Sequence, residues 1–244
     1  MKGVLLAGGL GTRLYPLTKI TNKHLLPVYN KPMVVYGIET LKRSGISEIM
    51  IVCGREHAGH FMNFLGSGKE YGVKISFALQ DKNNGGISDA LLYAEDFADR
   101  DSIAVILGDN IFEDEFSKSI ESFSGGAMVF LKKVPDPERF GVAVFDKSGK
   151  KLIGIEEKPK RPKSAYAQTG FYIYDFNVFS YIKKIKPSAR GELEITDANN
   201  MYLKRGELNF AFVSGFWFDV GTIDSLLNGS VILAKTASKK SNEK

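Results

Sequence analysis

Three glycines and two cations near the N-terminus form the first group of residues that could do chemistry. Gly8, Gly9 and Gly11 follow a short apolar run, and Arg13 and Lys23 come soon after them. Glycines let the backbone turn sharply, and the N–H groups exposed there can hold phosphate oxygens. Arg and Lys beside such a turn suit a triphosphate. The alternative is a tight strand-to-helix turn with two solvated cations, because the spacing matches neither a P-loop nor a dinucleotide fingerprint.

Two acids far apart in the chain could share a metal ion. Asp109 follows the apolar run Ile103–Leu107 and precedes Asn110. Ligands of open α/β sheets bind beyond the carboxyl ends of such strands, where a lone carboxylate can hold Mg²⁺ with waters and phosphate oxygens. Asp219 lies between large apolar residues, where an acid needs a partner, and a metal shared with Asp109 would supply one. The alternatives are an Asp-Asn turn or a helix N-cap at Asp109, and at Asp219 the N-cap of a helix that begins near Ile223.

An acid and a cation stand side by side in Glu156-Glu157-Lys158-Pro159. This pair can place a carboxylate on sugar hydroxyls and an ammonium on a phosphate. The alternative is the end of a surface strand. A metal site at His57 and His60 is not expected, because no third ligand lies nearby in the sequence.

The first half of the chain alternates apolar runs with helical patterns. This alternation predicts βαβ units and a mostly parallel sheet covered on both faces. The expected strands are Gly3–Ala7, Ile49–Cys53, Val73–Leu79 and Ile103–Leu107, and the expected helices are Pro32–Arg43, His57–Leu65 and Ser88–Phe97.

The second half is richer in strands and should add antiparallel pairs to the same sheet. The sequence predicts one domain over residues 1–235, with halves 1–125 and 126–235, and a disordered polar tail over 236–244. The expected strands are Ala127–Lys132, Gly141–Phe145, Leu152–Glu156, Ala167–Tyr174 and Leu208–Val213, and the expected helices are Val178–Ile185 and Ile195–Arg205.

Composition narrows the class of protein. The 244 residues are 43% hydrophobic and 25% charged, which excludes disordered, collagen-like and coiled-coil chains. No apolar run approaches the length of a membrane helix, and the N-terminal run is too short for a signal peptide. The single cysteine, Cys53, suits the reducing cytoplasm. The net charge of +5 makes nucleic-acid binding a hypothesis to consider. Because lysines alternate with acids along the chain, neither a nucleic acid nor a membrane is an expected partner.

Taken together, these motifs resemble the sugar-1-phosphate nucleotidylyltransferases, and most closely their thymidylyl branch. The stretch from Leu6 to Met33 is similar to the family signature G-G-x-G-T-R-L-x-P-x-T…K-x-L-L-P-V…K-P-M. The likeness covers about residues 1–235. Further matching stretches follow in order: Gln80, Gly85–Leu91, Leu107–Asn110, Asp136–Val142, Glu156–Pro159, Lys163–Ala167, Thr169–Tyr172 and Lys186–Asp197.

The resemblance implies a Rossmann-like, GT-A-like α/β fold and transfer of a deoxythymidylyl group from dTTP to glucose 1-phosphate, with Mg²⁺. It implies that Arg13 and Lys23 are catalytic, that Asp109 and Asp219 hold the metal, and that the chain forms a homo-oligomer. The nucleotide-binding residues in the first half would be Leu6, Gly8, Gly9, Gly11, Thr12, Arg13, Gln80, Gly85, Gly86 and Asp109. The sugar-phosphate-binding residues would be Asn110, Gly141, Glu157, Lys158, Thr169 and Gly170.

Several departures and alternatives stand beside this interpretation. Phe140 replaces a frequent Tyr of the family, and Ser88 replaces a usual Ala. The chain resembles a short form without the C-terminal helices that help to form a regulatory nucleotide site, so regulation at a second site is not expected. A UTP-dependent uridylyltransferase is the alternative enzyme. A non-catalytic sugar-nucleotide sensor is the alternative from another class, and it should have lost the metal acids or the cations.

Overall fold

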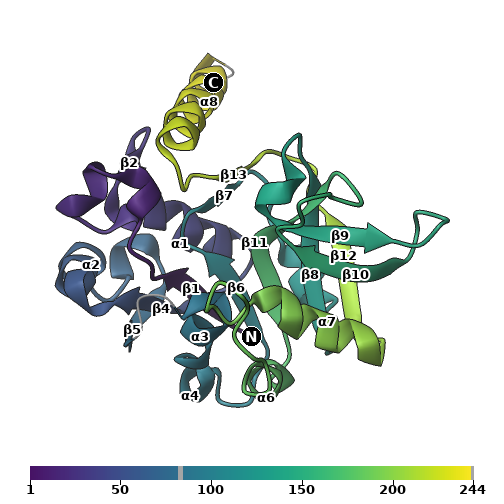
Figure 1. The fold of residues 1–244 in the computed structure, drawn as a ribbon. Helices are drawn as coiled ribbons and strands as arrows, with labels where there is room; N and C mark the ends of the chain where they lie inside the picture. Colours follow the sequence, from purple (N-terminus) through teal and green to yellow (C-terminus); the bar gives the residue numbers. More distant parts are fainter. Residues whose placement is uncertain (82–84, 243–244) are drawn as a thin grey trace.

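A nine-stranded mixed sheet forms the centre of the molecule (Figure 1). The computed structural model describes residues 1–81 and 85–242. The main path of the sheet runs β10-β9-β11-β6-β1-β4-β5, with β8 beside β11 and β12 beside β8. The strands of the first half are parallel to one another. They are β1 (Lys2–Ala7), β4 (Glu48–Gly54), β5 (Lys74–Gln80) and β6 (Ile103–Leu107).

The strands of the second half add mostly antiparallel pairs, as the sequence predicts. They are β8 (Ala127–Lys133), β9 (Gly141–Phe145), β10 (Leu152–Glu157), β11 (Tyr166–Tyr174) and β12 (Leu208–Phe212). β11 is antiparallel to β6, β8 and β9. Its register with β8 shifts between Gln168 and Tyr172, and Thr169 and Gly170 fall within this interval. Such irregularities re-aim the chain and are frequent beside active sites.

Helices cover both faces of the sheet. Alternate side chains of β1 point to opposite faces, and because both sets are apolar, each face needs a covering layer. Val4 and Leu6 belong to one core, whereas Leu5 and Ala7 belong to the other. This arrangement confirms the predicted Rossmann-like α/β fold. The first core is closed by α3 (Gly86–Leu92), α4 (Glu95–Ala98), α6 (Asn177–Ile182) and α7 (Ile195–Arg205), and the second by α1 (Met33–Arg43), α2 (Ala58–Leu65) and α5 (Ser117–Glu121). The helix expected over Ser88–Phe97 is therefore two short helices, α3 and α4.

Two small sheets that the sequence did not predict flank the main one. β7 (Asn110–Phe112) pairs antiparallel with β13 (Trp217–Asp219), and β2 (Pro27–Val28) pairs with β3 (Lys31–Pro32). The first pairing sets Asp219 opposite Asn110, although the two residues lie far apart in the sequence. Short 3₁₀ helices span Thr12–Leu14, Leu17–Lys19, Lys23–Leu25, Arg55–His57, Lys69–Tyr71 and Pro137–Arg139.

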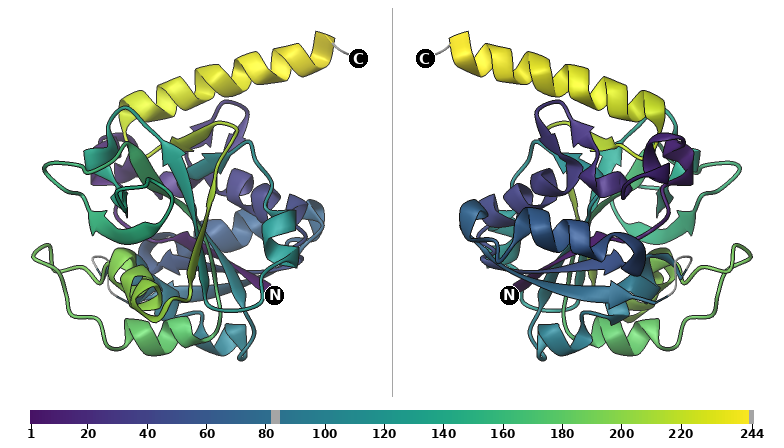
Figure 2. Two further views of the ribbon diagram at one scale, coloured as in Figure 1. Left: turned by 90° about the vertical axis from the view of Figure 1, so that its right-hand side faces the viewer. Right: turned by 90° about the vertical axis from the view of Figure 1, so that its left-hand side faces the viewer.

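The last element is a long helix, α8 (Ile223–Asn242), which lies along one end of the molecule and extends beyond it (Figure 2). The prediction of a disordered tail is wrong for residues 236–242, and the rest of that tail lies outside the described residues. The stretch continues the helix because it holds no proline or glycine and several good helix formers. The hydroxyls of Thr236 and Ser238 donate to carbonyls one turn earlier.

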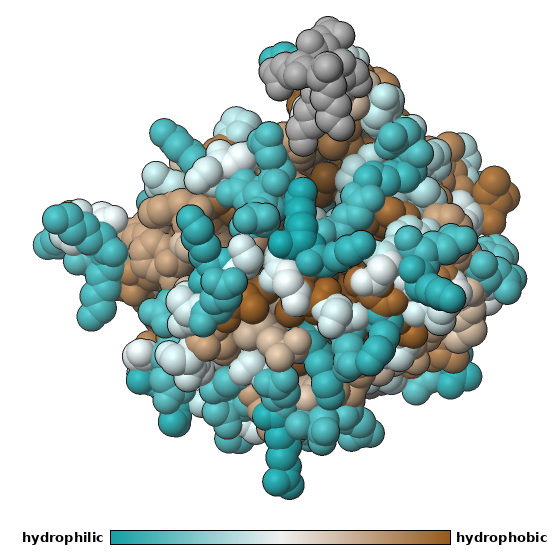
Figure 3. Space-filling model, turned by 180° about the vertical axis from the view of Figure 1, so that it is seen from behind, coloured by the Kyte–Doolittle hydropathy of each residue, from teal (hydrophilic) through white to brown (hydrophobic). Residues whose placement is uncertain are grey.

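Within the described part of the chain, no helix is long and apolar enough to cross a membrane. Seen from behind, hydrophilic and apolar side chains are mixed over the surface (Figure 3).

Candidate active site

A cavity of about 570 Å³ opens at the carboxyl ends of β1, β5 and β6. Its size falls within the range of small-molecule sites. Every site residue predicted from the sequence lines it except Gly85, which directly precedes the lining residue Gly86. Side chains that the prediction did not include also line it: His24, Arg139, Gln168, Tyr172, Arg190, Glu192, Glu194 and Trp217.

The glycine turn after β1 forms one wall of this cavity. Gly11 has a φ of +62°, a left-handed conformation that favours glycine. A β-carbon there would lie 3.0 Å from both Thr18 and Lys23, and the Thr18 hydroxyl donates to the Gly11 carbonyl at 2.8 Å. The turn is therefore fixed, with its backbone close to one of the two predicted cations.

Lys23 forms an ion pair with Asp109 inside the cavity. The Nζ and Oδ2 atoms are 2.5 Å apart, and the two side chains are only 15% and 12% exposed. Burial works to raise the pKa of Asp109, but the charge of Lys23 and the hydrogen bonds from Lys23 and Asn110 together hold that pKa below its ordinary value. The neighbouring His24 is buried, and burial lowers its pKa to about 3. Its imidazole is therefore neutral at physiological pH.

Asp219 lies next to Asp109 across the β7–β13 pair. The backbone N–H of Val220 donates to the Asp109 carbonyl at 2.9 Å. Burial, followed by the negative charge of Asp109, raises the pKa of Asp219, although Lys23 and Arg13 oppose the shift. A buried carboxylate and a half-buried one, the first of which destabilises the charge of the second, form a natural cation site.

These two carboxylates fit Mg²⁺, which takes one or two carboxylates and completes its shell with waters and phosphate oxygens. Over residues 1–81 and 85–242, no group of three or more His, Cys, Asp or Glu side chains could hold a metal. The cavity thus suits a cation that arrives with a phosphate ligand, rather than one enclosed by the protein alone.

Asn110 is occupied by protein groups at both ends of its amide. Its oxygen accepts from the Gly170 backbone at 2.9 Å and from the Trp217 indole at 2.6 Å. Its nitrogen donates to Oδ1 of Asp109 at 2.9 Å. Although Asn110 lines the cavity, these contacts give it the task of orienting Asp109, which the prediction of sugar-phosphate binding did not include.

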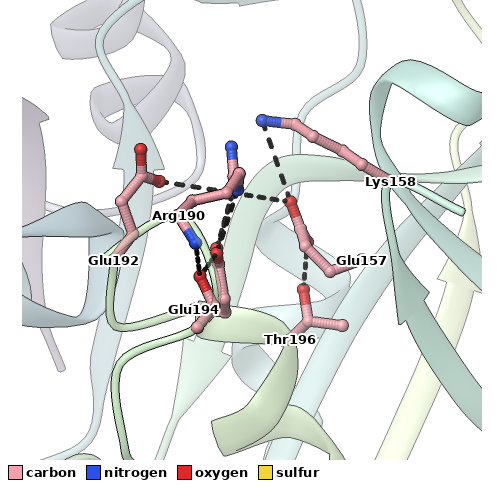
Figure 4. Close-up of polar contacts among 7 residues, drawn as sticks. Glu157, Lys158, Arg190, Glu192, Glu194 and Thr196 are labelled. Atoms are coloured by element: carbon pink, nitrogen blue, oxygen red, sulfur yellow. Dashed lines mark hydrogen bonds and ion pairs between the residues drawn. The ribbon is translucent and has the colours of Figure 1, made fainter.

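Glu157 and Lys158 line the cavity at the end of β10, which three strands separate from β1 in the sheet (Figure 4). Glu157 accepts a hydrogen bond from the Thr196 hydroxyl and forms ion pairs with Arg190 at 3.3 Å and Lys158 at 3.9 Å. Burial raises the pKa of Glu157, against the opposing effect of Thr196. Lys158 has a φ of +41°, which is uncommon for a non-glycine residue.

Arg190 gathers three acids at the rim of the site, as Figure 4 shows. Besides Glu157 it contacts Glu192 at 3.2 Å and Glu194 at 2.8 Å. The sequence did contain a signal for this cluster, because Arg190, Glu192 and Glu194 all fall in the matching stretch Lys186–Asp197. No role was assigned to that stretch, since only the folded chain places it beside β10.

The comparison with protein families shows to which family the chain belongs. The family model for nucleotidyl transferases matches residues 2–236. The chain belongs to the nucleotidyl transferase family.

Relatives within this nucleotidyl transferase family share most of the chain. The glucose-1-phosphate thymidylyltransferase of Neisseria meningitidis is 44% identical over 232 residues, which cover 93% of this chain and 80% of that enzyme. A crystal structure from Bacillus anthracis, provisionally named for the same activity and holding a sucrose, is 55% identical with a TM-score of 0.90 and covers 95% of this chain and 94% of that one.

A more distant nucleotidyl transferase structure shares the fold alone. It is a UDP-glucose pyrophosphorylase complexed with UDP-glucose, 24% identical with a TM-score of 0.83, covering 96% of this chain and 98% of that one. The family and its thymidylyl resemblance are thus confirmed, while the role of each site residue stays a prediction.

Proposed function

We propose that this chain transfers the deoxythymidylyl group of dTTP to glucose 1-phosphate, giving dTDP-glucose and pyrophosphate. The observation that carries the proposal is that one cavity is lined by the glycine turn with its cations, by Asp109 and Asp219, and by the Glu157–Lys158 pair. The relatives named for this activity support the choice of substrates.

The nucleotide lies on the glycine turn in this proposal. Backbone N–H groups from Gly8 to Thr12 hold phosphate oxygens, and Gln80 faces the base. Arg13 stabilises the leaving pyrophosphate, because its planar fork suits phosphate oxygens. Lys23 provides a second positive charge for the triphosphate when its ion pair with Asp109 opens.

Asp109 and Asp219 hold Mg²⁺ in the proposed site, and Asn110 keeps Asp109 in place. When bound, the ion supplies charge neutralisation at the phosphate that is attacked. The remaining work of binding, orienting and excluding water belongs to the side chains of the cavity.

Glucose 1-phosphate lies on the β10 side. Glu157 accepts from sugar hydroxyls, Gly141, Thr169 and Gly170 shape that wall, and Lys158 pairs with the phosphate. A phosphate oxygen of the sugar then attacks the α-phosphorus in line, and pyrophosphate leaves. That oxygen is already ionised, so the chain supplies no general base, and catalysis is positioning and charge stabilisation.

UTP is the alternative nucleotide, since uracil differs from thymine by one methyl, worth about 1–3 kcal/mol in an apolar pocket. A non-catalytic sensor is the weaker alternative, because Arg13, Lys23, Asp109 and Asp219 are all present. Oligomer formation and a cytoplasmic setting remain predictions from the sequence.

A substrate matrix tests the proposal. Pyrophosphate release is measured for dTTP, UTP, ATP and GTP against several sugar 1-phosphates, with Mg²⁺ and with excess chelator. The highest kcat/KM should belong to dTTP with glucose 1-phosphate, and the chelator should abolish turnover. A preference for UTP would support the uridylyltransferase alternative. No turnover with any pair of substrates would support the non-catalytic sensor.

A further inference from the structure

A buried hydrogen bond joins a cavity residue to an acid outside the cavity wall. Gln80, the last residue of β5, lines the cavity, whereas Asp89 in the first turn of α3 does not. The Nε2 atom of Gln80 donates to Oδ2 of Asp89 at 3.0 Å, and the two residues are 4% and 9% exposed.

This bond fixes which end of the Gln80 amide faces the cavity. A carboxylate has no proton to donate, so only the NH₂ group of Gln80 can face Asp89. The amide oxygen must then point the other way, toward Gly8, which lines the cavity. Turning the amide over would bring two acceptors together in a buried place, and an unsatisfied buried polar atom is costly.

Two glycines leave space for the pair in this orientation. A β-carbon at position 8 would overlap Oε1 of Gln80, and a β-carbon at position 85 would overlap the Asp89 carboxylate. Gly8 and Gly85, both predicted from the sequence as nucleotide-binding residues, therefore also serve the Gln80–Asp89 pair.

A fixed acceptor of this kind can discriminate between bases. Thymine and uracil carry a ring N3–H, which needs an acceptor, whereas the N3 of cytosine is itself an acceptor. A site with a fixed polar group rejects a ligand that leaves it unpaired much more strongly than it rejects a change of one methyl.

We propose that Asp89 is a specificity-determining positioning residue. It holds the Gln80 amide with its oxygen toward the nucleotide and so selects bases that carry a ring N–H over cytosine. This inference rests on the proposed function, and it assigns the selection to a residue that does not touch the nucleotide.

The test compares dTTP with dCTP in full-length Asp89→Asn, with glucose 1-phosphate and Mg²⁺. An Asn amide can donate to Gln80 and lets it turn its NH₂ toward the base, so the ratio of kcat/KM values should fall about tenfold or more. Asp89→Ala, which leaves Gln80 free to turn, should give the same result if Asp89→Asn does not fold. Asp89→Glu keeps an acceptor-only group and should stay closer to the native ratio.

Asp96→Asn is the matched control, because it removes the same charge from the exposed first turn of α4. Its dTTP-to-dCTP ratio should equal that of the native chain. Folded Asp89→Asn and Asp89→Ala variants that lose activity on both nucleotides equally would overturn the inference, since a merely structural role leaves the ratio unchanged.

Binding measurements distinguish a failure of this inference from a failure of the proposed function. Calorimetry with dTTP and dCTP reads base selection without turnover, in the native chain and in both variants. A native preference for dTTP that weakens in the variants supports the role of Asp89 even if no reaction with glucose 1-phosphate occurs. If the native chain reacts with dTTP but the variants keep the same preference for dTTP over dCTP, the proposed function stands and the inference about Asp89 is wrong.

Discussion

The Nζ of Lys23 lies 2.5 Å from Oδ2 of Asp109, and both side chains are largely shielded from water. The chain's own cation therefore neutralises one of the two acids proposed to hold the metal. In the proposed function, Mg²⁺ and the triphosphate would offer new partners to Asp109 and Lys23, so both groups would stay paired when the ion pair opens. Asp219 has no comparable cation at hydrogen-bond distance among the described residues.

Removing the negative charge from either acid should nearly abolish turnover. In Asp109→Asn and Asp219→Asn the oxygen that faces the metal loses its charge, and kcat should fall on the order of 10² to 10³-fold. The double variant should be little worse than either single one, because the two acids act as a unit. The measurement is pyrophosphate release with circular dichroism to verify the fold. Activity near the native level in either single variant would remove the metal assignment.

Lys158 and Arg13 should serve different substrates. Lys158→Ala should mainly raise the KM for glucose 1-phosphate, and Arg13→Ala should mainly impair use of dTTP, because Lys158 follows β10 and Arg13 follows β1, two strands that three others separate in the sheet. A lost charge-assisted hydrogen bond corresponds to about 1.5–3 kcal/mol, or roughly 10 to 150-fold. Lys160→Ala is the matched control on an exposed neighbour. If both variants weakened dTTP alone, this division of the site would be wrong.

The sequence predicts those parts of the site that local chemistry decides. The left-handed turn at Gly11 depends on the glycine itself. The burial of β1 on both faces depends on its own run of apolar residues. Asn110 is different, because its task depends on Trp217, 107 positions away. The same limit applies to Arg190, a loop residue whose partner Glu157 lies at the end of β10, 33 positions away.

Gly170→Ala should uncouple Asn110 from Asp109. A β-carbon at position 170 would lie 2.5 Å from Oδ1 of Asn110, closer than such atoms approach. The displaced amide would release Asp109, so kcat should fall about tenfold or more and stability by roughly 1–3 kcal/mol. Activity and urea unfolding measure both effects. Gly59→Ala, where nothing lies within 4 Å of the added carbon, should change neither kcat nor folding adversely.

His24 should make the protein less stable in acid. The folded chain keeps the pKa of this buried imidazole at about 3, whereas the unfolded chain titrates near 6.5. Between these values the unfolded state binds more protons, so the free energy of unfolding falls as the pH drops. The contribution approaches about 1.4 kcal/mol per pH unit. The raised pKa values of Glu157 and Asp219 act in the opposite direction, so a comparison between variants is required.

That comparison uses His24→Gln, which removes the titrating group. Its free energy of unfolding in urea, measured from pH 4.5 to 7, should change less steeply with pH than that of the native chain. Equal slopes in the two proteins would show that His24 does not carry the acid sensitivity.

Lys132 should support the metal site from a distance. Its ammonium donates to the carbonyls of Val213, Ser214 and Gly215 at 3.1, 2.9 and 2.6 Å, in the loop that leads into β13 and Asp219. Lys132→Met keeps an unbranched side chain of nearly the same length but leaves these carbonyls without their donor, which should cost about 1–3 kcal/mol of stability.

The loosened loop should hold Asp219 less well, so the Mg²⁺ concentration for half-maximal activity should rise several-fold in Lys132→Met. Lys133→Met is the matched control, since Lys133 is the exposed neighbour on the same strand and should leave the metal titration unchanged. If Lys132→Met is less stable than the native chain but has the same Mg²⁺ dependence, Lys132 stabilises the loop without affecting the metal site. Because the two lysines differ by one position, and strand side chains alternate between faces, any difference between the variants reports the direction of the side chain rather than the loss of charge.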